Sequence, residues 1–138
     1  MEHLRRALLL VRGVPLSMTA TEYAWATNDF YALAQEVVDA AHDLAQLCLK
    51  AERHDDAIWA AERGLLADPL AETLVRDLME AAAATGNTAR VHAAMTRLRQ
   101  QVAEDGDAND ADDWLHPETV RVFGALAGRS EAREGIRT

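Results

Sequence analysis

The sequence is poor in the residues that break helices or cross-link chains. Its 138 residues include three prolines, seven glycines and a single cysteine, so no disulfide can form within the chain. About a fifth of the residues are alanine, and only 5% are aromatic. Alanine has the highest helix propensity, whereas glycine and proline have the lowest. The composition therefore predicts an all-α fold built from packed helices.

Positive charge is also scarce. One lysine, Lys50, and 13 arginines face 23 acidic side chains, which gives a formal net charge of −9. Non-specific binding to nucleic acid depends on neutralising phosphates with lysine and arginine, so we expect no direct nucleic-acid binding and no membrane contact by this chain alone. The apolar run at residues 7–11 is too short to cross a bilayer, and no cleavable signal follows it. We expect a cytoplasmic protein.

Apolar residues recur at helical spacing along most of the chain. This spacing predicts about six helices, and the segments with the clearest pattern are residues 29–52, 53–69, 69–86, 88–103 and 117 to about 128. Asp68 and Pro69 read as the N-cap and first residue of a helix, and Gly86 as the left-handed residue that ends it. The acidic residues 104–113 are predicted to form a loop.

The chain shows a weak internal repeat of 34 residues. A shift of this length places Asp43 on Asp77 and Ala57 on Val91, and 34 residues is the period of tetratricopeptide units. We therefore predict antiparallel helix hairpins that stack on one another. The first residues start within an amphipathic pattern and lack an N-cap, so we expect the domain, residues 1–128, to be part of a longer protein. Residues 129–138 are expected to fray.

Two segments carry a resemblance to a known family. Residues 63–100, together with HPETVRVFGAL from His116, resemble the bacterial transcriptional activator domain, a helical module that follows the winged-helix domain in antibiotic-regulatory activators of actinobacteria. The segments ALLLVRGVPL and YAWA also match the family. The chain departs from it at Glu52-Arg53, where the family usually has Gly-Arg, and at Met95, where it has an aromatic residue.

The resemblance implies a non-enzymatic protein-protein interaction module, the C-terminal regulatory domain of a larger actinobacterial transcriptional regulator or signalling protein. A scaffold domain of an envelope-linked multidomain protein is an alternative, because the same module resembles part of such proteins. The expected partner is another domain of the same polypeptide, a second subunit that would make a homodimer, or a transcription component. We expect no cofactor.

Polar residues that repeat at the stacking period mark a candidate partner-binding groove. They lie away from the apolar stripes of two helices that are one repeat apart, and helical repeats use such surfaces to bind peptides or domains. We call these six residues the polar face: Asp39, His42, Gln46, Thr73, Arg76 and Glu80.

Three other patterns could carry chemistry, and each has a simpler interpretation. His42 and His54, with nearby aspartates, could serve a metal-dependent hydrolase, but His42 is predicted to lie mid-helix and His54 in the following turn, so capping or solvent-facing roles are favoured. Asp105, Asp107 and Asn109 match the start of a calcium loop, whose later glycine and glutamate are missing. Cys48 lies among apolar residues and is expected to be buried.

Overall fold

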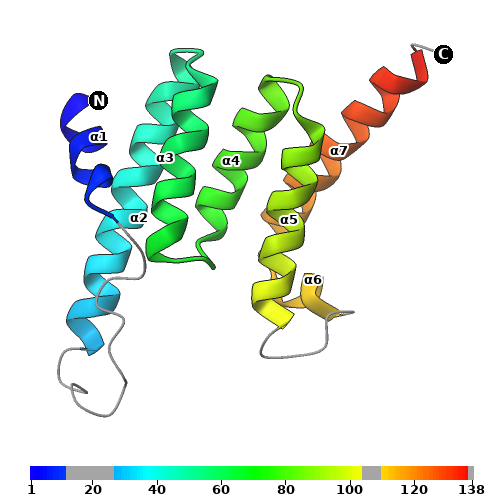
Figure 1. The fold of residues 1–138 in the computed structure, drawn as a ribbon. Coiled ribbons are helices and arrows are strands. Elements are labelled where there is room, and N and C mark those ends of the chain that lie inside the picture. The colour runs from blue at the N-terminus through cyan, green and yellow to red at the C-terminus, as the bar shows by residue number, and fades with distance from the viewer. Residues whose placement is uncertain (12–26, 104–109, 137–138) are drawn as a thin grey trace.

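The computed structural model describes residues 1–11, 27–103 and 110–136, and all regular secondary structure in these ranges is helical (Figure 1). Seven helices follow one another there: α1 (Glu2–Leu9), α2 (Thr27–Lys50), α3 (His54–Ala67), α4 (Glu72–Ala84), α5 (Thr88–Ala103), α6 (Ala111–Trp114) and α7 (Pro117–Ile136). The all-α prediction is confirmed.

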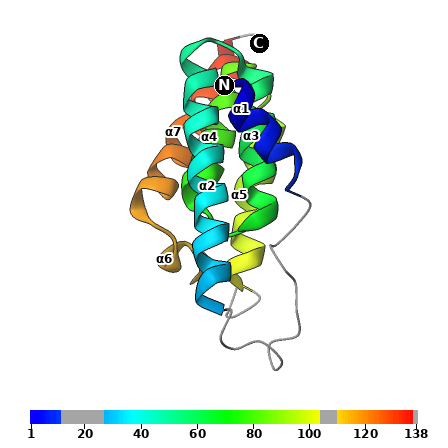
Figure 2. The ribbon, with the colours of Figure 1, turned by 90° about the vertical axis from the view of Figure 1, so that its left-hand side faces the viewer.

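The helices stack as antiparallel hairpins in two layers. Helices α2 and α3 form the first hairpin, α4 and α5 form the second, and α7 packs against both helices of the second. Figure 2 shows α2, α4 and α7 along one side of the molecule and α1, α3 and α5 along the other. Consecutive hairpins therefore present two different faces, one made by each layer.

Small side chains are buried in both helices of the first hairpin. Alanines of α2 and α3 are fully buried there, and Gly64 of α3 is buried beside them; the alanines are Ala41, Ala45, Ala57, Ala60 and Ala61. A Cβ atom at Gly64 would overlap Leu74 Cδ1 of α4 and would stand 2.5 Å from the Cβ of Ala41 on α2. The helices thus approach more closely at this point than a side chain would allow.

Helix α1 is held on α3 by arginines that surround one tryptophan. The guanidinium carbons of Arg5 and Arg63 lie 5.2 Å and 5.7 Å from the centre of the Trp59 ring. Arg5 also pairs with Asp56 at 2.8 Å, and Arg63 donates a hydrogen bond to the carbonyl oxygen of Val11 at 3.2 Å. Cation–π contacts and charged hydrogen bonds therefore fix the start of the chain on the first hairpin.

Several predicted boundaries are confirmed, including residues 88–103 for α5 and Pro117 as the first residue of α7. The start predicted at Pro69 is wrong, because α4 begins at Glu72. The Asp68 carboxylate accepts a hydrogen bond from the Leu70 amide at 3.0 Å, so Asp68 and Pro69 form a turn ahead of the helix. Leu70 in this turn is 49% exposed.

The chain is also more helical near its end than predicted. Helix α6 begins inside the segment predicted as a loop, where Ala111 is buried and Asp112 pairs with Arg99 of α5 at 2.7 Å. Residues 104–109 of that loop fall outside the described residues. Helix α7 continues past residue 128 to Ile136, through residues expected to fray, and the domain boundary at 128 stays a prediction.

Cys48 is buried, as predicted from its apolar neighbours. Its side chain is 2% exposed, and burial raises the pKa of its thiol. A thiol that is kept protonated and out of reach of solvent reacts poorly. Cys48 therefore contributes to the core as a small apolar residue.

Two helices end in the same left-handed turn, one with glycine and one without. At the end of α4, Gly86 has a φ of 77°, and the Asn87 amide donates to the Ala82 carbonyl oxygen at 2.9 Å. At the end of α2, Glu52 has a φ of 57°, and the Arg53 amide donates to the Cys48 carbonyl oxygen at 2.8 Å. Gly86 is the predicted cap, whereas Glu52 has a Cβ atom that the left-handed conformation disfavours.

We expect the Glu52→Gly substitution to raise the free energy of unfolding by about 1 kcal/mol, because glycine adopts positive φ without a steric penalty. Urea denaturation would measure the change. The control is Glu52→Ala, which removes the same carboxylate but keeps the Cβ atom and should stay within about 0.5 kcal/mol of the wild type. Equal midpoints for the glycine and alanine variants would show that Glu52 is not strained.

Candidate functional site

The six residues of the polar face come from two neighbouring helices of one layer. Asp39, His42 and Gln46 lie on α2, whereas Thr73, Arg76 and Glu80 lie on α4. Helices α2 and α4 pack side by side, and α7 flanks α4 in the same layer (Figure 2). The structure therefore allows the six side chains to be compared by what each one contacts.

His42 and Gln46 are bound to a buried carboxylate. Asp77 of α4 is only 3% exposed, His42 Nδ1 lies 2.6 Å from its Oδ2, and Gln46 Nε2 donates to its Oδ1 at 2.8 Å. Burial raises the pKa of Asp77, although the hydrogen bonds from His42 and Gln46 oppose this shift. Both carboxylate oxygens have partners, so these contacts join α2 to α4.

Arg76 and Thr73 take part in a second set of contacts, which joins α4 to α7. Arg76 Nη1 donates to the hydroxyl of the fully buried Thr119 at 2.7 Å, and Arg76 Nη2 donates to Thr73 Oγ1 at 3.3 Å. The Thr119 hydroxyl donates in turn to Glu72 Oε2 at 2.6 Å. The Glu72 carboxylate also accepts the His116 backbone amide at 2.9 Å and 3.1 Å, at the start of α7. Arg76 thus has a structural role.

Asp39 and Glu80 are the two members of the polar face that take part in neither of these sets of contacts. Asp39 is exposed and accepts a hydrogen bond from Gln35 of its own helix at 2.8 Å. Glu80 is exposed at the edge of α4, and within the described residues its carboxylate has no hydrogen bond or ion pair. Both carboxylates are exposed and accessible to a partner.

Glu80 also lies in a crowded electrostatic environment. Partial withdrawal from water raises the pKa of Glu80 most, and the negative charges of Asp77 and Glu118 raise it further, against the positive charge of Arg76. Glu118 belongs to α7, so the field at Glu80 comes from two helices of the layer. A carboxylate held among like charges is stabilised by a cation brought from outside.

The described residues do not support a metal site at the two predicted histidines. No group of three or more histidine, cysteine, aspartate or glutamate side chains within residues 1–11, 27–103 and 110–136 could hold a metal ion. His42 contacts Asp77, whereas His54 is the first residue of α3. The calcium-like residues Asp105, Asp107 and Asn109 lie outside the described residues.

Sequence reasoning missed the residues that anchor the polar face. Asp77 and Thr119 are polar but almost fully buried, and helical spacing assigns such residues to the core without naming a partner. The repeat places Asp77 on Asp43, but Asp43 is exposed, so the repeat does not indicate that Asp77 is buried. The HPET segment was read as a helix start, and there His116 Nδ1 does accept the Glu118 amide at 3.2 Å.

Comparison with known protein families matches residues 1–126 to the family described as bacterial transcriptional activator domain. The chain belongs to this family. The bacterial transcriptional activator domain is a helical, tetratricopeptide-like regulatory domain, which agrees with the stacked hairpins. Comparisons with curated proteins and with solved structures give no match. Over the described ranges, none of the helices is both long and apolar enough to span a membrane.

We expect Asp77→Asn to become more stable relative to the wild type as the pH rises from about 3.5 to 5.5. Because the pKa of Asp77 is raised above 3.8 in the folded state, the folded domain holds this proton at a pH where the unfolded chain has lost it. Its contribution to stability is therefore complete below 3.8 and is lost as the pH rises through the folded pKa. Asparagine does not titrate.

Urea unfolding of both proteins at small pH steps measures this difference. Both proteins contain the same other carboxylates, so the comparison removes the contribution of those carboxylates to the pH dependence of stability. One of them is Asp112, whose pKa is lowered by the hydrogen bond from Arg99. If the difference in free energy of unfolding between the two proteins stayed constant with pH, or if the wild type gained stability relative to Asp77→Asn as the pH rose, the raised pKa of Asp77 would be contradicted.

Proposed function

We propose that the polar face docks this bacterial transcriptional activator domain onto another protein within an actinobacterial transcription regulator. The partner surface is a second domain of the same polypeptide, a second subunit or a transcription component, and it is basic. The observation that carries the proposal is the free carboxylate of Glu80, held near Asp77 and Glu118. Asp39 adds a second exposed acid on the neighbouring helix.

The mechanism is docking without catalysis. The contacts of Asp77 fix α2 to α4, and those of Thr119 fix α4 to α7, so the acids are presented on helices that are already ordered. A preorganised surface loses little conformational entropy on binding, and its charge selects the partner and its orientation. Such a domain would act in the cytoplasm, where transcription takes place.

The charge of the chain supports a protein partner over DNA. The net charge is −9, and arginines of the described residues already pair with acids, as Arg99 does with Asp112 and Arg121 with Glu118. Little positive surface remains to neutralise phosphates. Any contact with DNA in the regulator would then be made by another domain.

Photocrosslinking in cells tests the proposal. A photoreactive amino acid at position 39 should crosslink the domain to a protein, and Glu80→Arg should reduce that crosslink several-fold, because it places a cation where the partner's cation binds. Glu80 is the residue to reverse because Arg76 is needed by Thr119. Glu80→Arg should keep the free energy of unfolding within about 0.5 kcal/mol of the wild type.

The matched control places the photoreactive residue at Ala93, which is exposed on α5 in the opposite layer. Crosslinks of equal strength from positions 39 and 93, or crosslinks from position 39 that Glu80→Arg leaves unchanged, would overturn the proposal. Saturable binding of the domain alone to a labelled DNA duplex at physiological salt would favour direct DNA contact instead.

A further inference from the structure

An apolar groove lies on the layer opposite the polar face, between α3 and α5. It has a volume of about 260 Å³, and its lining includes Leu65 of α3, Val75 and Leu78 of α4, and Leu98 of α5. Val75, Leu78 and Leu98 are buried at 3%, 5% and 2% exposure, so they form a closed floor under the groove. Leu66, which also lines the groove, is 41% exposed.

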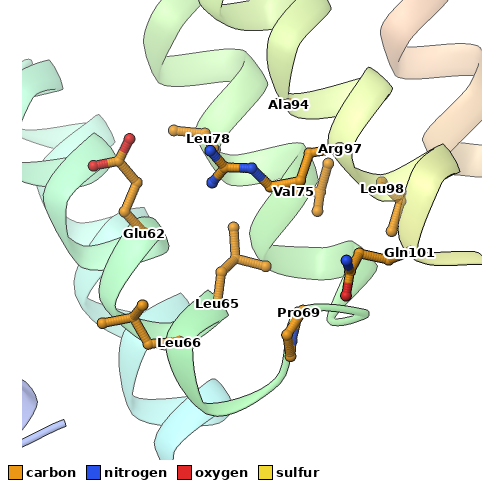
Figure 3. Close-up of a pocket in the computed structure, with 10 residues that line it drawn as sticks. All are labelled: Glu62, Leu65, Leu66, Pro69, Val75, Leu78, Ala94, Arg97, Leu98 and Gln101. Atoms are coloured by element: carbon orange, nitrogen blue, oxygen red, sulfur yellow. The ribbon is translucent and has the colours of Figure 1, made fainter. Parts of the chain in front are cut away.

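The rim of the groove carries an arginine that pairs with no acid of the described residues. Figure 3 shows Arg97 reaching from α5 over the groove, with Glu62 on the α3 wall opposite. Glu62 pairs with Arg90 of α5 at 3.7 Å, whereas the Arg97 guanidinium has no hydrogen bond or ion pair within the described residues. Arg90 thus occupies the carboxylate of Glu62, and the guanidinium of Arg97 is left without a partner among the described residues.

The acid at the lower end of the groove, Asp68, forms no ion pair with Arg97. Asp68 precedes Pro69 in the turn that closes the groove, and its carboxylate is used by the Leu70 amide at 3.0 Å. In Figure 3 the amide of Gln101 stands at the α5 side of that end. The groove therefore combines an apolar floor, one free cation over it and one neutral polar group at its end.

We propose that this groove binds a small amphiphilic carboxylate, with the apolar chain on the leucine-rich floor and the carboxylate on Arg97. Small-molecule sites are mostly apolar concavities with few polar groups that fix orientation. A dry cavity of about 150 Å³ holds benzene and drug-sized sites begin at about 300 Å³, so a groove of 260 Å³ suits a short alkyl chain.

Such a ligand would touch both hairpins of the domain. Leu65 and Glu62 belong to the first hairpin, and Leu98 and Arg97 belong to the second. A molecule bound between them would stabilise one spacing of α3 and α5 and would raise the stability of the folded domain with ligand concentration. The groove would then supply the regulator with a small-molecule input that is separate from the polar face.

Titration with sodium decanoate, below its micelle-forming concentration at pH 7, tests the proposal. Decanoate should bind saturably with a sub-millimolar Kd and shift the amide NMR signals of residues 62–66, 75–78 and 94–101. Arg97→Gln should weaken binding about tenfold, as expected for loss of a charged hydrogen bond. Decan-1-ol should bind the wild type about tenfold more weakly than decanoate, and that difference should disappear in Arg97→Gln.

A substitution that fills the groove with a larger side chain tests the proposal independently. Ala94 lines it, so Ala94→Phe should abolish decanoate binding, whereas Ala93→Phe, one residue along the same helix and exposed, should leave the Kd unchanged. If Ala94→Phe fails to fold, Arg97→Gln with the alcohol comparison decides the result. No saturable decanoate binding by the wild type, equal binding of decanoate and decanol, or an unchanged Kd in Arg97→Gln would overturn the proposal.

Discussion

The close approach of α3 to two other helices at Gly64 is the constraint on which the rest of the domain depends. Gly64 has no side chain, and the space that a Cβ atom would need is filled by Leu74 of α4 and by the Cβ atom of Ala41 on α2. The leucine end could rotate, but Ala41 Cβ is fixed to its backbone, so the helices would have to separate. Buried alanines continue the same close contact along α2 and α3.

This contact places α4 at the centre of both surfaces. On one side α4 meets α2 and α7 through hydrogen bonds that require short separations, such as 2.6 Å between His42 and Asp77 and 2.7 Å between Arg76 and Thr119. On the other side Leu78 forms part of the floor between α3 and α5. A shift of α4 by even one ångström would lengthen these hydrogen bonds beyond their useful range. Both the polar face and the apolar groove therefore depend on the packing of these small residues.

Periodicity predicted the long helices because each has a continuous apolar stripe, as in α5, where Val91, Met95 and Leu98 are buried. It failed where a local signal has two structural readings. The sequence Asp68-Pro69 is compatible with a helix start and with a turn. The acidic residues around Ala111 are typical of a loop, but here they belong to a short helix that Arg99 contacts. Periodicity placed the polar face on one side of the two helices. It could not show that Arg76 is held by a hydrogen bond whereas Glu80 is not, because the partner of Arg76 lies 43 residues away in the sequence.

The most direct test compares Gly64→Ala with Gly124→Ala by urea unfolding. Both sites are helical, and the substitution alone favours helix by up to about 1 kcal/mol. A Cβ atom at Gly124 meets nothing within 4 Å, so Gly124→Ala should be as stable as the wild type or more stable. Gly64→Ala should instead lose about 1–3 kcal/mol, the usual cost of overpacking. A Gly64→Ala domain as stable as Gly124→Ala would contradict the claim that this contact sets the spacing of α2, α3 and α4.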